Sequence, residues 1–297
     1  MSLKRISNYN VVFDLIIKDD LVVLDSSFED HFHYTVELLF KLIEEYSKKY
    51  NRPCVFYTMN ETLSNSKNIF YKNFCWTLYK DINPPKYQAY KYNFTYLCGF
   101  PREDKLNMLS RLFEENLLQD SLWSCGTPKD QYDLNLPELP EIIDYDKSIK
   151  KISKCWSEID QDFYKNSRFS LVQETEMTTR SNRYTEKTYK CFWMKHSFIL
   201  AGNYQTLKLL QQDGFKTFHP HIDESYDNIK DRDQRISAII KQVKILCNKT
   251  TKEWQEFMCN INEALEHNYQ HAASRKSNRL YKNNNNRTSC HFRCGGE

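Results

Sequence analysis

The chain has 297 residues, of which 40% are hydrophobic and 27% charged, so it can bury one large or two ordinary cores and is not disordered throughout. The formal net charge is +3, but residues 274–297 contain six Lys or Arg and one Glu, which gives 6 − 1 = +5 there and 3 − 5 = −2 for the rest. We therefore predict a basic, disordered tail at 274–297 and no nucleic-acid partner for the slightly acidic body.

Neither a membrane span nor a metal site is expected from the sequence. No run of about eighteen apolar residues occurs, and the first ten residues lack the apolar stretch of a signal peptide. The ten cysteines lie mostly in apolar segments, which is typical of a reducing compartment, and the spacing "CHFRC" at 290–294 has no second half that would complete a zinc site. These patterns predict a cytoplasmic protein without a metal.

The first part of the chain alternates short β-rich runs with amphipathic stretches. The pattern predicts strands at 10–17, 20–27, 53–60, 92–100 and 122–126, and helices at 31–50 and 102–118. Such alternation is typical of βαβ units and a mostly parallel sheet.

A segment rich in proline then interrupts the pattern. Residues 128–145 hold several prolines and no helical period, which suits a linker. We therefore predict an N-terminal α/β domain at 1–127, a linker at 128–145 and a second α/β domain at 146–273.

The second domain repeats the alternation. Helices are expected at 146–159, from 185 onward, and at 204–213, 231–246 and 252–273, and strands at 168–175, 197–202 and 214–218. The fold class predicted for the whole chain is α/β with two domains in tandem.

Unusual residues follow the strands of the second domain, where open α/β sheets bind their ligands. Glu174 follows one strand, Gly202 ends the next, and the intervening helix has Glu186 and Lys187 in its first turn. A helix N-terminus attracts phosphate, and Lys187 adds a full positive charge there. The alternative is a solvated helix start capped by Thr185, and composition and spacing alone leave both interpretations open.

Three motifs in this domain resemble the donor site of alpha-1,3-fucosyltransferases. "FSLVQETE" at 169–176, "NRYTEKTYKCF" at 182–192 and "SFILAG" at 197–202 are similar to the family patterns F-x-L-x-F-E-N-S, D-Y-[IV]-T-E-K and P-V-V-x-G. The chain departs from them at Thr175-Glu176, at Asn182-Arg183 and before the last strand. The likeness extends over 169–242 and is closest to virus- and phage-encoded relatives; upstream, "YLCGFPREDKLNMLSRL" resembles a segment of those relatives in which two basic residues open a helix.

The resemblance implies a GT-B fold, in which two Rossmann-like domains face each other across a cleft. It also implies a metal-independent, inverting glycosyltransferase that moves a sugar, with fucose as one candidate, from a nucleotide-sugar donor to a glycan or other hydroxyl acceptor. A GDP-linked donor is the first expectation, no further cofactor is implied, and a viral relative would act in the host cytoplasm or the virion. The residues that would contact the donor are Arg102, Lys105, Glu174, Arg183, Tyr184, Glu186, Lys187 and Gly202.

An inverting transferase also needs a base that accepts the proton of the acceptor hydroxyl. Glu61, which directly follows the predicted strand at 53–60, is our candidate for this catalytic residue, and Asp25 occupies a similar position after another strand. The competing interpretation of the whole chain is a catalytically inactive GT-B scaffold that binds a glycan or a protein partner.

Overall fold

A computed structural model of the chain defines the positions of most helices and strands. It describes residues 4–8, 11–17, 20–26, 35–58, 68–71, 84, 90–98, 102–125, 159, 161–175, 177 and 183–275. The candidate base Glu61, the predicted linker 128–145, the predicted helix at 146–159 except for residue 159, and the tail beyond 275 lie outside the described residues.

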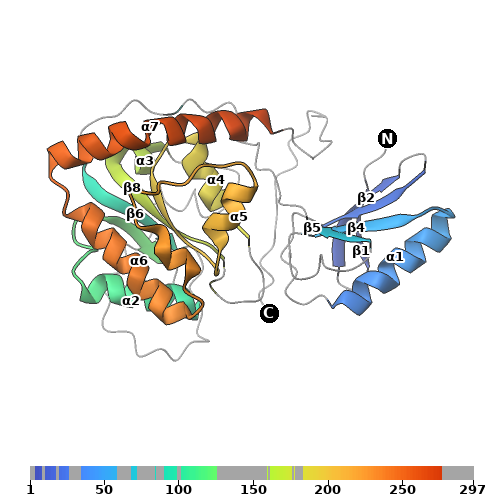
Figure 1. Cartoon of the computed structure of the whole chain (residues 1–297). Coiled ribbons are helices and arrows are strands. Elements are labelled where there is room, and N and C mark those ends of the chain that lie inside the picture. The colour runs from blue at the N-terminus through green and yellow to red at the C-terminus, as the bar shows by residue number, and fades with distance from the viewer. Residues whose placement is uncertain are drawn as a thin grey trace.

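The first sheet belongs to the N-terminal part of the chain (Figure 1). Its strands follow the chain in the order β1 (Lys4–Asn8), β2 (Val11–Ile17), β3 (Val22–Asp25), β4 (Cys54–Thr58) and β5 (Ile69–Tyr71). β1 pairs with β2 and β2 with β3 in antiparallel fashion, whereas β3, β4 and β5 are parallel. The sequence predicted neither β1 nor β5, and the sheet is mixed rather than mostly parallel.

Helix α1 (Val36–Tyr50) covers the apolar side of this sheet. The Thr35 hydroxyl accepts a hydrogen bond from the Leu38 N–H (3.2 Å), and Asn51 ends the helix in the left-handed conformation. Leu39 and Leu42 lie fully buried against Phe56 and the other apolar side chains of the sheet. The described helix therefore confirms the predicted one over its last fifteen residues.

The second sheet is entirely parallel. Its spatial order is β7 (Leu122–Cys125), β6 (Tyr92–Cys98), β8 (Ser167–Gln173) and β9 (Phe198–Ala201). β8 and β9 are buried along nearly their whole length, which is what continuous apolar runs in a parallel sheet predict.

Helices cover both faces of this sheet, as Figure 1 shows. α2 (Glu103–Glu114) and α6 (Arg232–Cys247) lie on one face, and α3 (Gln161–Asn166), α4 (Glu186–Trp193) and the long α7 (Thr251–Ser274) lie on the other. α5 (Thr206–Gln212) and the 3₁₀ helix η4 (Glu224–Asn228) follow β9 and contact each other.

The two sheets have separate hydrophobic cores, but the division between them differs from the predicted one. β6, α2 and β7 fall before residue 127, yet Tyr92, Phe94 and Thr95 of β6 pair with β8, and the side chains of α2 join the core of the second sheet. The described residues of the first core end at Ile69. Pairing of strands distant in sequence decides this grouping.

The predicted strand at 214–218 is wrong. Phe215 and Phe218 are buried in the core, but the segment between them is not paired with any strand. Instead, the side-chain amide of Asn268 on α7 accepts a bond from the Lys216 N–H (2.7 Å) and donates one to the Lys216 carbonyl (2.8 Å). Asn268 thus satisfies the backbone groups that a neighbouring strand would otherwise bind.

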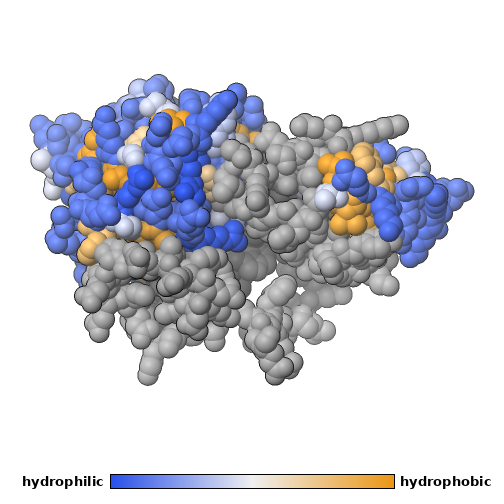
Figure 2. Space-filling model, turned by 90° about the horizontal axis from the view of Figure 1, so that it is seen from below, coloured by the Kyte–Doolittle hydropathy of each residue, from blue (hydrophilic) through white to orange (hydrophobic). Residues whose placement is uncertain are grey.

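The described surface is mostly hydrophilic in the view of Figure 2, with an apolar group on the N-terminal part. Three of the four large exposed apolar side chains in the described part, namely Ile17, Phe40 and Phe70, belong to the first sheet and its helix. Among the described residues, no helix is long and apolar enough to cross a membrane.

Candidate functional site

The carboxyl ends of β6 and β8 form a topological switch point. From β6 the chain passes through α2 to β7, and from β8 it passes through α4 to β9, so the two connections leave in opposite directions and cover opposite faces. In open α/β sheets, ligands bind in the crevice at such a point. α2 and α4 both begin at this edge of the sheet, and their starts carry four of the eight predicted donor-contacting residues, namely Arg102, Lys105, Glu186 and Lys187.

Glu174, which directly follows β8, fixes the beginning of α4. Its carboxylate, of which 1% is exposed, accepts bonds from the Thr185 N–H (2.8 Å), the Thr185 hydroxyl (2.6 Å) and the Thr188 hydroxyl (2.6 Å). The side chain of Thr185 does not cap the helix itself. The predicted Thr185 cap is therefore wrong, and Glu174 instead binds Thr185 and Thr188 and is a structural anchor of the site.

Lys187 lies among oxygen atoms at the same helix start. Its ammonium group is 3.2 Å from the Glu186 carboxylate and 3.8 Å from Glu174, and it donates to the hydroxyls of Thr185 (3.0 Å) and Thr175 (3.3 Å). About a quarter of the side chain (27%) is exposed. Lys187 is therefore held in place while part of it can still meet a ligand.

Charges at this helix start stabilise one another. Burial alone would raise the pKa of Glu186, but the ammonium groups of Lys187 and Lys190 outweigh it and hold the pKa below its usual value. Burial alone would lower the pKa of Lys187, but the carboxylates of Glu186 and Glu174 raise it above its usual value. Both Glu186 and Lys187 are thus ionised at neutral pH.

Two further cations come from the start of α2. The Arg102 guanidinium donates to the Thr175 carbonyl (3.2 Å), which links α2 to the loop that follows β8. Lys105 is 6% exposed, and within the described part of the chain its ammonium group makes neither a hydrogen bond nor an ion pair. A buried charge of this kind is costly unless something else neutralises it.

The environment of Lys105 disfavours its charged form. Burial lowers the pKa of Lys105, and the nearby cations Lys187 and Arg102 lower it further, while Cys98 and Asp104 oppose the shift. The effect of Lys187 on Lys105 indicates that cations from the two helix starts face one common region. A bound polyanion would neutralise both.

The structure places the other predicted donor-contacting residues as follows. Arg183 is 8% exposed and close enough to Lys187 to act on its charge. Tyr184 is fully buried between Tyr189 and Phe215, and its hydroxyl donates to Asp213 (2.5 Å), so it belongs to the core.

Gly202 has a packing role that the sequence did not reveal. A Cβ at this position would lie 2.6 Å from the Thr206 hydroxyl oxygen, so the missing side chain makes room for the start of α5. The Asp227 carboxylate accepts the N–H groups of Leu207 (3.0 Å) and Lys208 (3.2 Å) and so occupies that helix start.

Sequence reasoning missed Arg235, Thr175 and Asp227. The signal for Arg235 was available, because Arg235 precedes the buried Ile236 and lies one turn before the buried Ile239. A charged residue on the core-facing side of a helix indicates a buried partner, which here is a set of backbone carbonyls.

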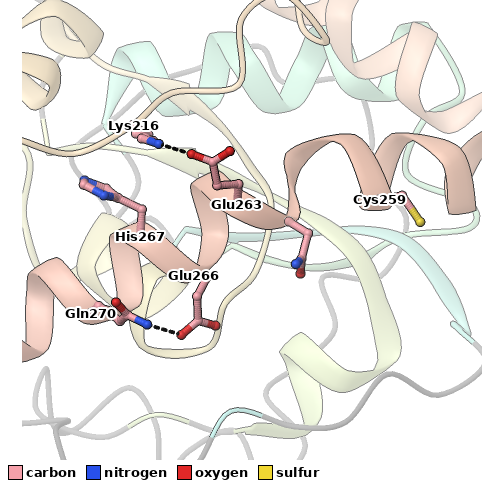
Figure 3. Close-up of a pocket in the computed structure, with 7 residues that line it drawn as sticks. Lys216, Cys259, Glu263, Glu266, His267 and Gln270 are labelled. Carbon is pink, nitrogen blue, oxygen red and sulfur yellow. Dashed lines mark hydrogen bonds and ion pairs between the residues drawn. The ribbon is translucent and has the colours of Figure 1, made fainter.

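Two surface hollows of the described part lie away from these residues. One, of about 530 Å³, lies over α7, where Lys216 pairs with Glu263 and Gln270 with Glu266 (Figure 3). The other, of about 780 Å³, lies between α2 and α6 around Arg111. No group of three potential metal-binding side chains occurs among the described residues.

Comparison with known proteins yields one distant structural likeness. No family model matches the chain. A search of curated proteins also finds no match. A solved structure of the DNA-modifying enzyme beta-glucosyltransferase, studied with and without its substrate uridine diphosphoglucose, aligns with a TM-score of 0.43 and 10% identity over 74% of this chain. The alignment covers 61% of that enzyme's chain, and at this distance its substrate is a property of that enzyme alone.

Proposed function

We propose that this chain is a glycosyltransferase that binds the diphosphate of a nucleotide sugar at the switch point between β6 and β8. The observation that carries the proposal is the ammonium group at the end of the largely buried Lys105 side chain, which makes no hydrogen bond or ion pair with any described residue and lies near Lys187 and Arg102. A diphosphate has the charge and the oxygen acceptors that such a set of cations requires.

The backbone at the start of α4 supports the same ligand. Glu174 accepts the Thr185 N–H, but within the described part of the chain the N–H groups of Glu186 and Lys187 make no hydrogen bond. Free N–H groups at a helix start bind phosphate oxygens, and the helix dipole adds to the attraction. The Lys187 side chain lies beside these groups and would complete the site.

The chemistry of sugar transfer explains why cations belong at this point. When the bond between the sugar and the diphosphate breaks, negative charge develops on the leaving phosphate, and fixed cations stabilise it. Lys187, Lys105 and Arg102 would supply that stabilisation in a transfer that needs no metal. An inverting reaction with a GDP-linked donor, with fucose among the candidate sugars, follows from the resemblance of the three motifs.

The acceptor side remains a prediction from sequence. Glu61 is the proposed base for the hydroxyl of a glycan or other acceptor, and it lies outside the described residues. The two-domain cleft that would bring it to the donor is likewise part of the proposal.

The proposal is tested by measuring thermal stability and sugar transfer with GDP-, UDP- and CMP-linked sugars. We expect one donor to raise the Tm. Its binding increases the free energy of unfolding by RT ln(1 + [L]/Kd), which is about 2.7 kcal/mol at a hundredfold excess over Kd. Lys187→Met should remove this shift, whereas Lys195→Met, a control just beyond the other end of α4, should keep it.

The outcomes separate the two interpretations of the chain. A donor that binds and transfers its sugar supports the transferase, and binding without turnover on any acceptor favours the inactive scaffold. If no nucleotide sugar raises the Tm of the wild-type protein, both interpretations of the site fail.

A further inference from the structure

Arg235 of α6 joins three separate segments of the second sheet through a single buried guanidinium. Its Nε donates to the Gly202 carbonyl (3.1 Å), one terminal nitrogen donates to the carbonyls of Ile229 (2.6 Å) and Lys230 (3.1 Å), and the other donates to the Met177 carbonyl (2.7 Å). These carbonyls belong to the loop after β8, the end of β9 and the segment that precedes α6.

The burial of Arg235 makes this arrangement specific. Only 2% of the residue is exposed, and the guanidinium is bound to four backbone carbonyls rather than to a carboxylate. A planar guanidinium presents its N–H groups in a fixed fan, so each carbonyl must keep its position for all four bonds to form. Arg235 thus fixes the distances between the three segments.

One of these segments holds the cations of the candidate site. Met177 lies two residues after Thr175, whose carbonyl accepts from Arg102 and whose hydroxyl accepts from Lys187. The loop also begins at Glu174, which anchors the start of α4. A shift of Met177 would therefore move the atoms that hold Arg102 of α2 and Lys187 of α4 relative to each other.

We propose that Arg235 is a positioning residue that sets the spacing between the cations of α2 and those of α4, and so sets the affinity of the site for a diphosphate. The distance between these cations is inferred from the hydrogen bonds of Arg235, whereas the effect on diphosphate affinity rests on the proposed function. Arg235 does not contact the ligand itself. It acts on the site through the loop that contains Thr175 and Met177.

The test compares Arg235→Lys with Arg232→Lys, three residues earlier on the same helix. Arg232 lies at the surface, where it pairs with Glu103 (3.0 Å) and Asp233 (3.1 Å), so a lysine there keeps the charge and the ion pairs. At Arg235, a lysine keeps the charge but cannot reach four carbonyls in three segments. Affinity for inorganic pyrophosphate and for GDP is measured by calorimetry well below the Tm of each variant.

We expect Arg235→Lys to weaken both affinities about tenfold or more, because an ammonium cannot reproduce the guanidinium fan. Arg232→Lys should remain within about twofold of the wild type, as expected for a surface pair. Leu246→Ala removes a buried side chain from the same helix and lowers the Tm, but it leaves the loops at the switch point in place and should keep the affinity. This variant separates positioning from a general loss of stability.

The proposal is overturned if Arg235→Lys binds pyrophosphate and GDP like the wild type, or if Leu246→Ala loses as much affinity. If the wild type binds neither pyrophosphate nor GDP, the proposed function fails. The positioning role of Arg235 is then tested by hydrogen exchange. Faster exchange at residues 174–177 in Arg235→Lys than in Arg232→Lys supports the positioning role, and equal exchange refutes it.

Discussion

Replacing Lys105 with methionine is expected to stabilise the protein and to weaken its binding of a diphosphate. The side chain is 6% exposed, and its ammonium has no bonded partner in the described part of the chain, so it contributes a desolvation cost without a compensating bond. The backbone bonds of the residue, from its N–H to Asp104 (2.9 Å) and from the Tyr96 hydroxyl to its carbonyl (3.2 Å), do not depend on the side chain. Methionine has a similar length and adapts to irregular space.

The expected gain in stability follows from known replacements of buried charges. Replacing buried ion pairs by apolar side chains of similar volume is often neutral or stabilises proteins by about 1–4 kcal/mol, and Lys105 lacks even the paired charge among the described residues. For a domain of this size, each kcal/mol corresponds to a Tm shift of about 2–4 °C. Loss of one hydrogen bond to a charged ligand costs about 1.5–3 kcal/mol, so the affinity for pyrophosphate should fall about tenfold to a hundredfold.

The pH dependence of the free energy of unfolding gives a second measure of the effect of the Lys105 charge. Because the pKa of Lys105 in the folded state is lower than in the unfolded state, the unfolded chain binds more protons between the two values. Wild-type stability should therefore rise with pH in the window that ends near the ordinary lysine pKa of about 10.4. The advantage of Lys105→Met should shrink through this window.

Urea unfolding and pyrophosphate calorimetry measure the two effects, and Lys241→Met, an exposed position on α6, is the control. The control should change stability by less than about 0.5 kcal/mol. A Lys105→Met variant that is less stable than the wild type, or that binds pyrophosphate equally well, would refute the reasoning.

Two further predictions concern the second core. Burial lowers the pKa of His196 to about 4, so stability should fall by up to about 3 kcal/mol as the pH drops from 6.5 through 4, and His196→Gln should flatten this loss in urea unfolding at a series of pH values. A chain that ends at Arg275 should unfold like the full-length protein. One that ends at Ala273 loses the Arg275 bond to the Tyr189 hydroxyl (3.0 Å) and should be less stable by about 1–3 kcal/mol, whereas equal Tm values would show that Arg275 contributes nothing.

The sequence predicted the parts of the fold that local patterns determine. The apolar run from Phe169 to Val172 and the amphipathic stretch after Thr185 have clear periods, and the structure confirms β8, α4 and β9 there. β1 could not be predicted, because its residues "KRISN" become a strand only through pairing with β2. The pairing of β6 with β8 also joins residues more than seventy positions apart, and a local pattern does not encode it.

The candidate site was predicted through the rule for strand ends and through the resemblance, but its internal contacts were not. Lys187 and Glu186 lie at the helix start as expected. That Glu174 binds Thr185 and Thr188 at this helix start depends on where the loop after β8 turns, which only the folded chain determines. Gly202 was predicted to contact the donor, but the group that lies closest to it is the Thr206 side chain of the same chain.

The positive and negative charges at the switch point nearly balance, so the affinity of the site for a diphosphate depends mainly on Lys105. Five cations face three carboxylates, which leaves 5 − 3 = +2; these residues are Arg102, Lys105, Arg183, Lys187 and Lys190 with Asp104, Glu174 and Glu186. Net charge alone would attract a diphosphate only weakly. Lys187 must also give up its contacts with Glu186 and Glu174 to bind the ligand, and this loss cancels much of the free energy gained from the new contact. Lys105 has no such contact to give up, so a charged hydrogen bond to a phosphate would offset its desolvation cost without breaking another bond.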